Sequence, residues 1–103
     1  MKNSINSASA EYNDNRISLY TGQQGKCFVT NEVLKIGDIE VHHKKPRNQG
    51  GTDEYKNLCL VTADIHKLIH ATQEDTVQKY LNKLNLSNEA LKKLKKLSVL
   101  VGN

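Results

Sequence analysis

Residues 40–71 read EVHHKKPRNQGGTDEYKNLCLVTADIHKLIHA and contain all four histidines of a 103-residue chain. His42 and His43 are neighbours at the end of an extended, alternating run, and His66 and His70 stand four residues apart in a segment with helical character. A basic loop with a Gly-Gly pair separates the two histidine pairs. Few other side chains are chemically reactive, so this stretch is where the sequence indicates a function.

The spacing of the histidines predicts a metal site. Residues four apart on a helix share one face, so His66 and His70 can bind one cation together. Successive side chains of a strand point to opposite faces, so we expect His42 and His43 to have different roles. Three imidazoles with an open position are typical of a catalytic metal site rather than a closed structural one. The fourth imidazole would then be free to accept a proton near neutral pH.

The composition indicates one small domain with a basic surface. The chain has 15 Lys and Arg against 11 Asp and Glu, which gives a net charge of +4. Two clusters are prominent: Lys44, Lys45 and Arg47 beside the histidines, and the lysines between positions 92 and 96. Both suit a phosphate-rich partner, although lysine runs on helices are usually only solvated. We rank the first cluster higher because it adjoins the histidines.

The sequence lacks the signals of a membrane or secreted protein. No apolar run is long enough for a transmembrane helix, and residues 1–15 lack the charged-then-apolar pattern of a secretion signal. We therefore expect a cytoplasmic protein without a membrane partner. Cys27 and Cys59 are expected to stay unpaired there, and they are too few for a four-cysteine zinc site.

The first two thirds of the chain predict short extended elements. We expect a flexible or loosely docked tail over 1–14, followed by a short helix through Tyr20 that ends at one of the next glycines. Short strands are predicted over 26–30, 32–37 and 38–43, then a loop over 44–55, and a strand or buried loop over 57–61.

Three helices are predicted to follow. Thr62 can cap a helix over 63–71, and Ser87 can cap one over 88–100. Thr72 and Asp75 resemble a capping box for a helix over 73–84. The last helix carries an apolar stripe that must pack on the rest of the domain, formed by Leu91, Leu94, Leu97 and Val101.

This pattern resembles the HNH endonuclease motif, whose fold is called ββα-metal. That motif has an acidic residue, two histidines, a Gly-Gly loop, an Asn-Leu dipeptide and a metal-binding histidine on the following helix. His43, Asn57 and His66 match the three letters that name it, and the likeness covers about 45 residues, 27–71. The resemblance implies an α+β fold: a small ββα-metal nuclease core with short strands and additional C-terminal helices.

The resemblance also implies a role for each matched residue. A divalent cation would be bound by three histidines, as in the three-histidine version found in nuclease colicins: His42, His66 and His70. His43 would be the general base that activates water. Asn57 would hydrogen-bond the backbone across the loop and so position His43, and Glu40 would assist near the metal.

The implied reaction is hydrolysis of a DNA phosphodiester bond with one divalent cation. The cation would stabilise charge on a nonbridging oxygen and on the leaving oxygen, while His43 takes a proton from water. Mg²⁺ or Mn²⁺ is expected to act, although three imidazoles favour Zn²⁺ or Ni²⁺ in affinity. Lys44, Lys45 and Arg47 are the residues expected to contact the DNA.

One departure from the family pattern concerns zinc. Many relatives carry a zinc knuckle of two CxxC pairs, but here the first pair reads Cys27 and Thr30 and the second reads Thr62 and Ile65. Cys59 falls outside the expected position. We therefore expect no structural zinc, and we expect the C-terminal helices to supply the missing core.

A narrower resemblance covers residues from Tyr12 into the last helix. This part is similar to the C-terminal endonuclease segment of bacterial group II intron-encoded proteins, in which a reverse transcriptase and maturase precede the nuclease. The resemblance divides the chain into a tail over 1–14, a nuclease core over 15–71 and a helical extension over 72–103. A remnant, a fragment and an independent small nuclease all fit the sequence, and a reverse transcriptase/maturase chain is a partner if it is a fragment.

Three other interpretations stay open at this point. The histidines could be dispersed surface or core residues, although their concentration within 42–70 argues against that. The domain could be a nucleic-acid-binding module that has lost cleavage. It could also be a purely structural metal fold, in which all four histidines close around one ion.

Overall fold

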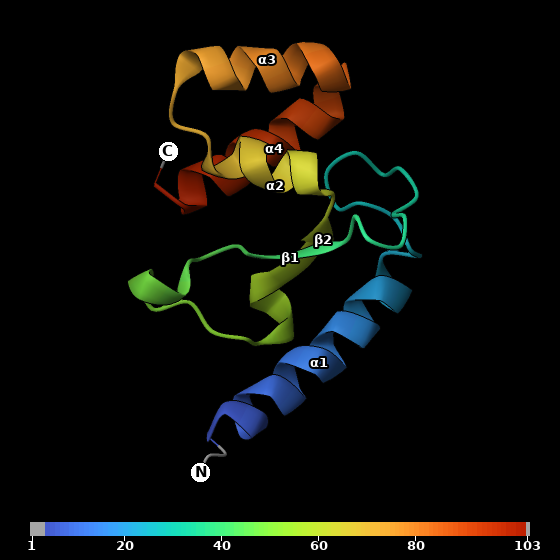
Figure 1. The fold of residues 1–103 in the computed structure, drawn as a ribbon, viewed down its shortest axis with the longest axis vertical. Coiled ribbons are helices and arrows are strands. Elements are labelled where there is room, and N and C mark those ends of the chain that lie inside the picture. Colours follow the sequence, from blue (N-terminus) through green and yellow to red (C-terminus); the bar gives the residue numbers. More distant parts are fainter. Residues whose placement is uncertain (1–3, 103) are drawn as a thin grey trace.

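The computed structural model describes residues 4–102, and they form a small α+β fold (Figure 1). In chain order the elements are α1 (Ser4–Gly22), β1 (Glu40–His43), the 3-10 helices η1 (Arg47–Gln49) and η2 (Tyr55–Asn57), β2 (Leu58–Val61), α2 (Ala63–His70), α3 (Glu74–Leu84) and α4 (Asn88–Leu100). The two strands pair antiparallel, with Glu40 opposite Val61 and His43 opposite Leu58. The predicted α+β class is therefore confirmed at this level.

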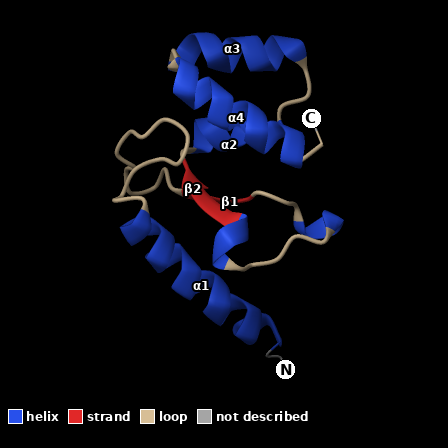
Figure 2. Ribbon diagram, turned by 180° about the vertical axis from the view of Figure 1, so that it is seen from behind, coloured by secondary structure: helices blue, strands red, loops and turns tan. Residues whose placement is uncertain are grey.

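Helices cover the two-stranded sheet from both sides (Figures 1 and 2). Helix α1 contacts β2 on one side, while α2 contacts β1 on the other and itself packs against α3 and α4. All four residues of β2 are buried, which explains why residues 58–61 form an unbroken apolar run instead of an alternating one. The segment that the sequence left as either strand or buried loop is a fully buried strand.

The strands predicted over 26–30 and 32–37 are wrong. This segment contains a single isolated bridge, between Lys26 and Val33. The amide of Asn31 donates to the carbonyl of Cys27 at 2.9 Å, and Asn31 has a left-handed φ of 62°. The resulting tight turn uses residues that the alternating pattern assigned to a longer hairpin. The third predicted strand forms, but it begins at Glu40 instead of Asp38.

Helix α1 is much longer than the short helix expected from the sequence. Residues 4–14 were expected to be a tail, yet the helix runs without interruption from Ser4 to Gly22. Among residues 10–22 of this helix, Leu19 is buried and Tyr12 is partly buried against the core. Polar residues between these two positions left no apolar stripe to recognise. Residues 1–3 of the expected tail lie outside the described residues, and the division of the chain into three parts stays a prediction.

The helix caps show which local signals were reliable. The side chains of Thr62 and Ser87 accept hydrogen bonds from the amides three residues on, as predicted for the starts of α2 and α4. The capping box at Thr72 is wrong, because α3 begins at Glu74 with Gln73 at its N-cap and no side-chain bond. Leu94 and Leu97 of α4 are buried, so this helix contributes to the core as expected.

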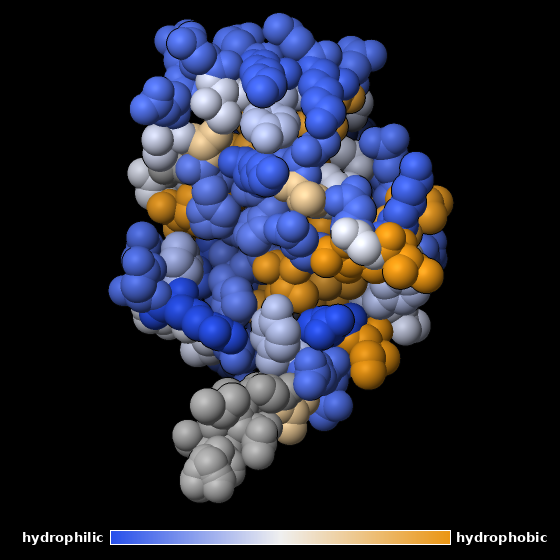
Figure 3. Space-filling view, viewed as in Figure 1, coloured by the Kyte–Doolittle hydropathy of each residue, from blue (hydrophilic) through white to orange (hydrophobic). Residues whose placement is uncertain are grey.

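The surface is mostly polar, with scattered apolar side chains. Figure 3 shows a hydrophilic surface over the α3 end of the molecule and apolar groups in the middle and on the right of this face. The most exposed large apolar side chains include Ile17, Val33 and Ile36. None of the helices within residues 4–102 combines the length and the apolar character needed to span a lipid bilayer.

Candidate metal centre and active site

Three imidazoles from two elements converge on one point. His42 comes from β1, and His66 and His70 come from successive turns of α2. Their ring centroids are 5.1 to 5.3 Å apart, and one ligand atom from each residue lies within 4.8 Å of the others. Nitrogens bound to one zinc ion in a tetrahedron are about 3.4 Å apart, so small ring rotations would complete a site. These three histidines could therefore hold a metal ion.

The environment of His42 fits a metal ligand. The residue is fully buried, and neither of its ring nitrogens has a hydrogen-bond partner. A buried polar group without a partner costs about 1–3 kcal/mol, so such groups call for an explanation. A cation shared with His66 and His70 would satisfy the orphaned nitrogen that points toward them. His70 is exposed, so one side of the cluster faces solvent and leaves room for water or substrate.

Glu40 orients one of the other two imidazoles. Its Oε1 lies 2.6 Å from Nδ1 of His66, and because a carboxylate only accepts, Nδ1 carries the proton. The Nε2 atom of His66 is then left with a free lone pair. A carboxylate that fixes the tautomer of a metal-ligating histidine is the usual outer partner in such sites. Glu40 therefore contacts one of the three candidate ligands, and the predicted assistance of Glu40 near a metal stays a prediction.

Burial keeps His42 neutral. Desolvation, followed by the nearby charges of His66 and His70, lowers the pKa of His42 to about 3. The pKa of His70 is also lowered, chiefly by burial and then by His66. At neutral pH both rings keep a lone pair available, and metal binding at these two positions needs no proton release.

Acid should destabilise the metal-free protein. The pKa of His42 is about 3 in the folded state against 6.5 for an ordinary histidine, so between these values the unfolded chain binds a proton that the folded chain does not. The free energy of unfolding should therefore fall as the pH drops below about 6.5. Urea unfolding in EDTA at pH 7.5 and pH 5.5 measures this. His42→Leu should lose most of the dependence, and an equal dependence in that variant would contradict the assignment.

His43, the other neighbour in β1, does not join the cluster. Its Nε2 lies 2.8 Å from Oδ1 of Asp53, and its side chain is mostly buried. Asp53 accepts this bond, so Nε2 carries the proton and Nδ1 keeps the lone pair. The hydrogen bond from His43, followed by those from Arg47, lowers the pKa of Asp53 and keeps it ionised. His43 is thus held by an anion, with one nitrogen free to accept a proton.

Helix α1 closes the other side of His43. The ring of Tyr12 stacks on His43 with centroids 6.2 Å apart, and the amide of Asn15 donates to the backbone carbonyl of Asp53 at 2.7 Å. The guanidinium of Arg47 lies over the same tyrosine, 5.8 Å from its centroid. Part of the segment expected to be a tail therefore packs against the candidate base.

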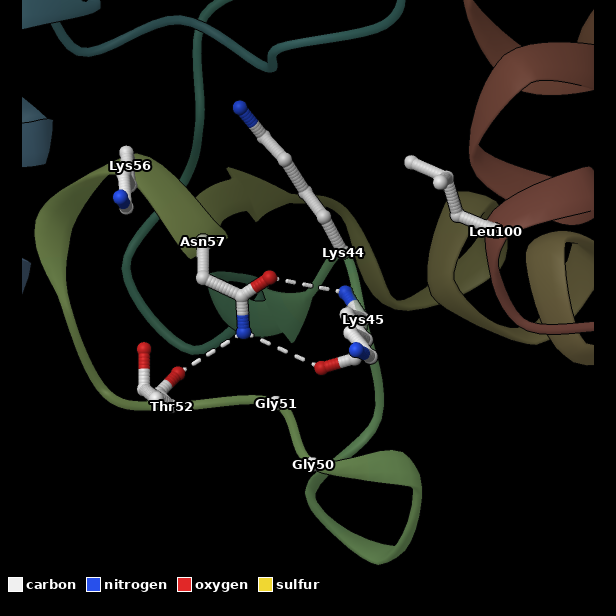
Figure 4. A pocket seen from close by; sticks show the side chains of 8 residues that line it. All are labelled: Lys44, Lys45, Gly50, Gly51, Thr52, Lys56, Asn57 and Leu100. Carbon is white, nitrogen blue, oxygen red and sulfur yellow. Dashed lines mark hydrogen bonds between the residues drawn. The ribbon is translucent and has the colours of Figure 1, made fainter.

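Asn57 ties the loop together as the resemblance implied. Its Oδ1 accepts from the amide of Lys45 at 2.9 Å, and its Nδ2 donates to the carbonyls of Lys45 and Thr52 at 3.1 and 2.8 Å (Figure 4). Lys45 lies two residues from His43, and Thr52 precedes Asp53. Asn57 therefore holds both ends of the loop that brings the carboxylate to the imidazole.

The Gly-Gly pair is required by this loop. Gly50 has a φ of 89°, and a Cβ on Gly51 would lie 1.7 Å from the carbonyl oxygen of Lys45. Any side chain at position 51 would push the two halves of the loop apart. The glycines therefore allow the close approach on which the Asn57 bonds and the His43–Asp53 bond depend.

Asp53 is the candidate site residue that the sequence reasoning missed. It lies 10 residues from His43, and no regular element relates the two positions. The only available signal was an acidic residue just after the Gly-Gly pair.

Of the residues expected to contact DNA, Arg47 binds both oxygens of Asp53 at 2.9 and 3.1 Å, while Lys44 and Lys45 make no ion pair among the described residues.

No family model, curated protein or solved structure matches this chain. Its four histidines form a candidate metal centre of three imidazoles with a fourth, separately held imidazole beside it. A purely structural metal fold would need all four histidines to bind one ion. This arrangement does not fit such a site, because His43 is bound to Asp53.

Proposed function

We propose that this protein is a metal-dependent HNH endonuclease that hydrolyses phosphodiester bonds in DNA. The observation that carries the proposal is that two neighbouring histidines of β1 have different partners. His42 faces α2, where it meets His66 and His70, whereas the next residue, His43, is held by Asp53 with one nitrogen free. A cation site and a proton acceptor side by side are the two parts that one-metal hydrolysis requires.

Each residue then has a distinct task. His42, His66 and His70 would hold a divalent cation, which would supply positive charge to stabilise the negative charge that develops during phosphodiester hydrolysis. Glu40 orients His66. Nδ1 of His43 accepts the proton of the attacking water, and the ionised Asp53 stabilises the resulting imidazolium. Asn57 positions the loop and takes no part in the chemistry.

The donor set indicates which metals would bind most tightly, and the metal proposed for activity is a different one. Three neutral imidazoles favour Zn²⁺ or Ni²⁺ in affinity, while Mg²⁺ or Mn²⁺ is the ion we propose for activity in the cell. His70 is exposed, so an ion held by the three histidines would be accessible from solvent. We retain the proposal that the chain is related to the endonuclease segment of group II intron-encoded proteins, based on the sequence from Tyr12 onward.

The test is cleavage of supercoiled plasmid DNA. The protein is stripped with EDTA and supplied in turn with Mg²⁺, Mn²⁺, Zn²⁺ and Ni²⁺, and nicked and linear products are followed with time. Metal-dependent nicking that EDTA stops supports the proposal. DNA binding without cleavage under every metal would instead support the second candidate, a nucleic-acid-binding remnant of an intron-encoded protein.

Asp53→Asn should slow cleavage by roughly tenfold to a hundredfold, because a hydrogen bond to a charged partner is lost while the loop can persist. The maximal rate should fall while the Michaelis constant for DNA and the affinity for metal stay unchanged. Asp53→Asn should also change the ¹⁵N shifts of the His43 ring, which report its tautomer. An Asn variant with full activity, or one that loses metal binding, would show that Asp53 does not act through His43.

A further inference from the structure

We propose that a cavity beside the candidate active site binds one sugar–phosphate unit of the nucleic-acid backbone. Its walls are three lysines (Lys44, Lys45 and Lys56), the Gly-Gly turn, Asn57 and the side chain of Leu100 from α4 (Figure 4). The cavity volume is about 360 Å³. This lies near the lower end of the range for small-molecule sites, roughly 300–1,000 Å³, and suits a single nucleotide unit. The identity of the ligand rests on the proposed nuclease function.

The charge of the cavity selects an anion. None of the three lysines takes part in any of the four ion pairs of the described residues, and no carboxylate lines the cavity. Asn57 cannot serve as a ligand, because its oxygen and both amide protons are already engaged with Lys45 and Thr52. The positive charge is therefore supplied by side chains that have no competing anion, which suits a phosphate.

The Gly-Gly turn opens the cavity. A Cβ on Gly50 would lie 3.7 Å from Nζ of Lys45, so the ammonium group lies directly over the bare turn. The amides of both glycines already donate to Arg47 and Pro46. Recognition must therefore come from the lysine side chains, with the turn providing room for the ligand to approach.

Leu100 distinguishes a sugar–phosphate from a free phosphate. Leu100 is 49 % exposed, and its side chain forms an apolar wall of the cavity at the end of α4. In Figure 4 it lies on the opposite side of Asn57 from Lys56. A free phosphate gains nothing from an apolar wall, whereas a deoxyribose attached to the phosphate can bury carbon surface against it.

This assignment changes the expected set of phosphate contacts. Arg47 is already bound to both oxygens of Asp53, and Nζ of Lys44 lies 5.0 Å from the ring centroid of Phe28. Lys45 and Lys56 are the cations with no such partner. Lys56, which the sequence did not single out, thus takes the place of Arg47. Both lysines come from the loop that Asn57 joins to His43, so the bound unit flanks the cleaved bond.

The first test measures how salt affects binding to a fluorescent DNA duplex in EDTA, where cleavage cannot occur. Each phosphate contact contributes about 0.9 to the slope of log affinity against log salt. Lys45→Gln with Lys56→Gln should lower that slope by about 0.9, because the cavity holds a single phosphate. The matched control is Lys35→Gln with Lys79→Gln. It removes the same charge from two exposed lysines that do not line the cavity, one between α1 and β1 and one in α3, and it should leave the slope unchanged. Equal losses in both double variants would mean diffuse attraction and would overturn the proposal.

The second test separates the backbone unit from a free anion. Amide shifts of Gly50, Gly51 and Thr52 are followed by NMR during titration with the dinucleotide dTpdT and, separately, with inorganic phosphate. The dinucleotide should bind more tightly, and Leu100→Ser should remove that advantage. Equal binding of the two probes with no effect of Leu100→Ser would overturn the sugar–phosphate assignment.

The cavity and the proposed nuclease function can fail separately. If the wild type binds DNA with the predicted lysine contribution but cleaves under no metal, the nuclease proposal fails and the cavity stands. If the wild type cleaves DNA and the double lysine variant keeps the wild-type salt slope, the cavity proposal fails and the nuclease stands.

Discussion

Replacing His43 with alanine should lower the rate of DNA cleavage by about 10²- to 10⁴-fold, the usual contribution of a general base. Nδ1 of His43 is the nitrogen that keeps its lone pair, since Nε2 carries the proton and donates a hydrogen bond to Asp53. The affinity for metal should stay unchanged, because His43 does not belong to the imidazole cluster. The plasmid assay gives the rate, and calorimetric titration of the same sample gives the metal affinity.

The control for His43→Ala is a change that removes the stacked neighbour and leaves the imidazole in place. Tyr12→Leu keeps an apolar side chain against the His43 ring and should retain most of the activity. A loss of metal binding in His43→Ala as large as that in His66→Ala would show that His43 is a ligand. Unchanged cleavage in His43→Ala would remove it from the chemistry altogether.

The histidine cluster could be predicted from the sequence because two local rules apply to it. The i, i+4 spacing of His66 and His70 places both on one face of a helix, and strand alternation separates His42 from His43. The structure brings His42, His66 and His70 together as expected. Asn57 also makes the predicted bonds to backbone across the loop. In each case the relevant neighbours are fixed by regular elements or by a turn with a recognisable Gly-Gly pair.

What the sequence did not predict depends on irregular backbone and on weakly patterned contacts. Asp53 reaches His43 because the loop folds back at Gly51, where a Cβ would collide with the backbone of Lys45. This close packing follows no periodic pattern in the sequence. Tyr12 reaches the same ring because α1 begins at Ser4, although its polar first half shows no apolar periodicity. Composition indicated a tail over residues 1–14. Extending an existing helix costs less free energy than starting a new one, so a few contacts are enough to extend the helix from Leu19 toward the N-terminus.

Zinc should raise the thermal stability of the wild-type protein, and His66→Ala should abolish that effect. A ligand that binds only the folded state stabilises it by about 2.7 kcal/mol at 100 times its dissociation constant. The ion would also satisfy His42, which is fully buried and has no partner for either ring nitrogen. Melting curves with and without Zn²⁺ measure the effect, and Mn²⁺ and Ni²⁺ should behave alike in sign.

Two further variants show whether the imidazole cluster is the binding site. Glu40→Gln keeps the size of the side chain and removes the charge that holds Nδ1 of His66, so zinc affinity should fall by about 10- to 100-fold without being abolished. Cys27→Ala tests the alternative that the thiols of Cys27 and Cys59, which are both buried and unpaired, bind the ion. Full zinc stabilisation should survive in Cys27→Ala. Its loss there, together with full stabilisation in His66→Ala, would place the ion at the thiols and refute the three-histidine site, because a histidine that binds the ion cannot be dispensable for it.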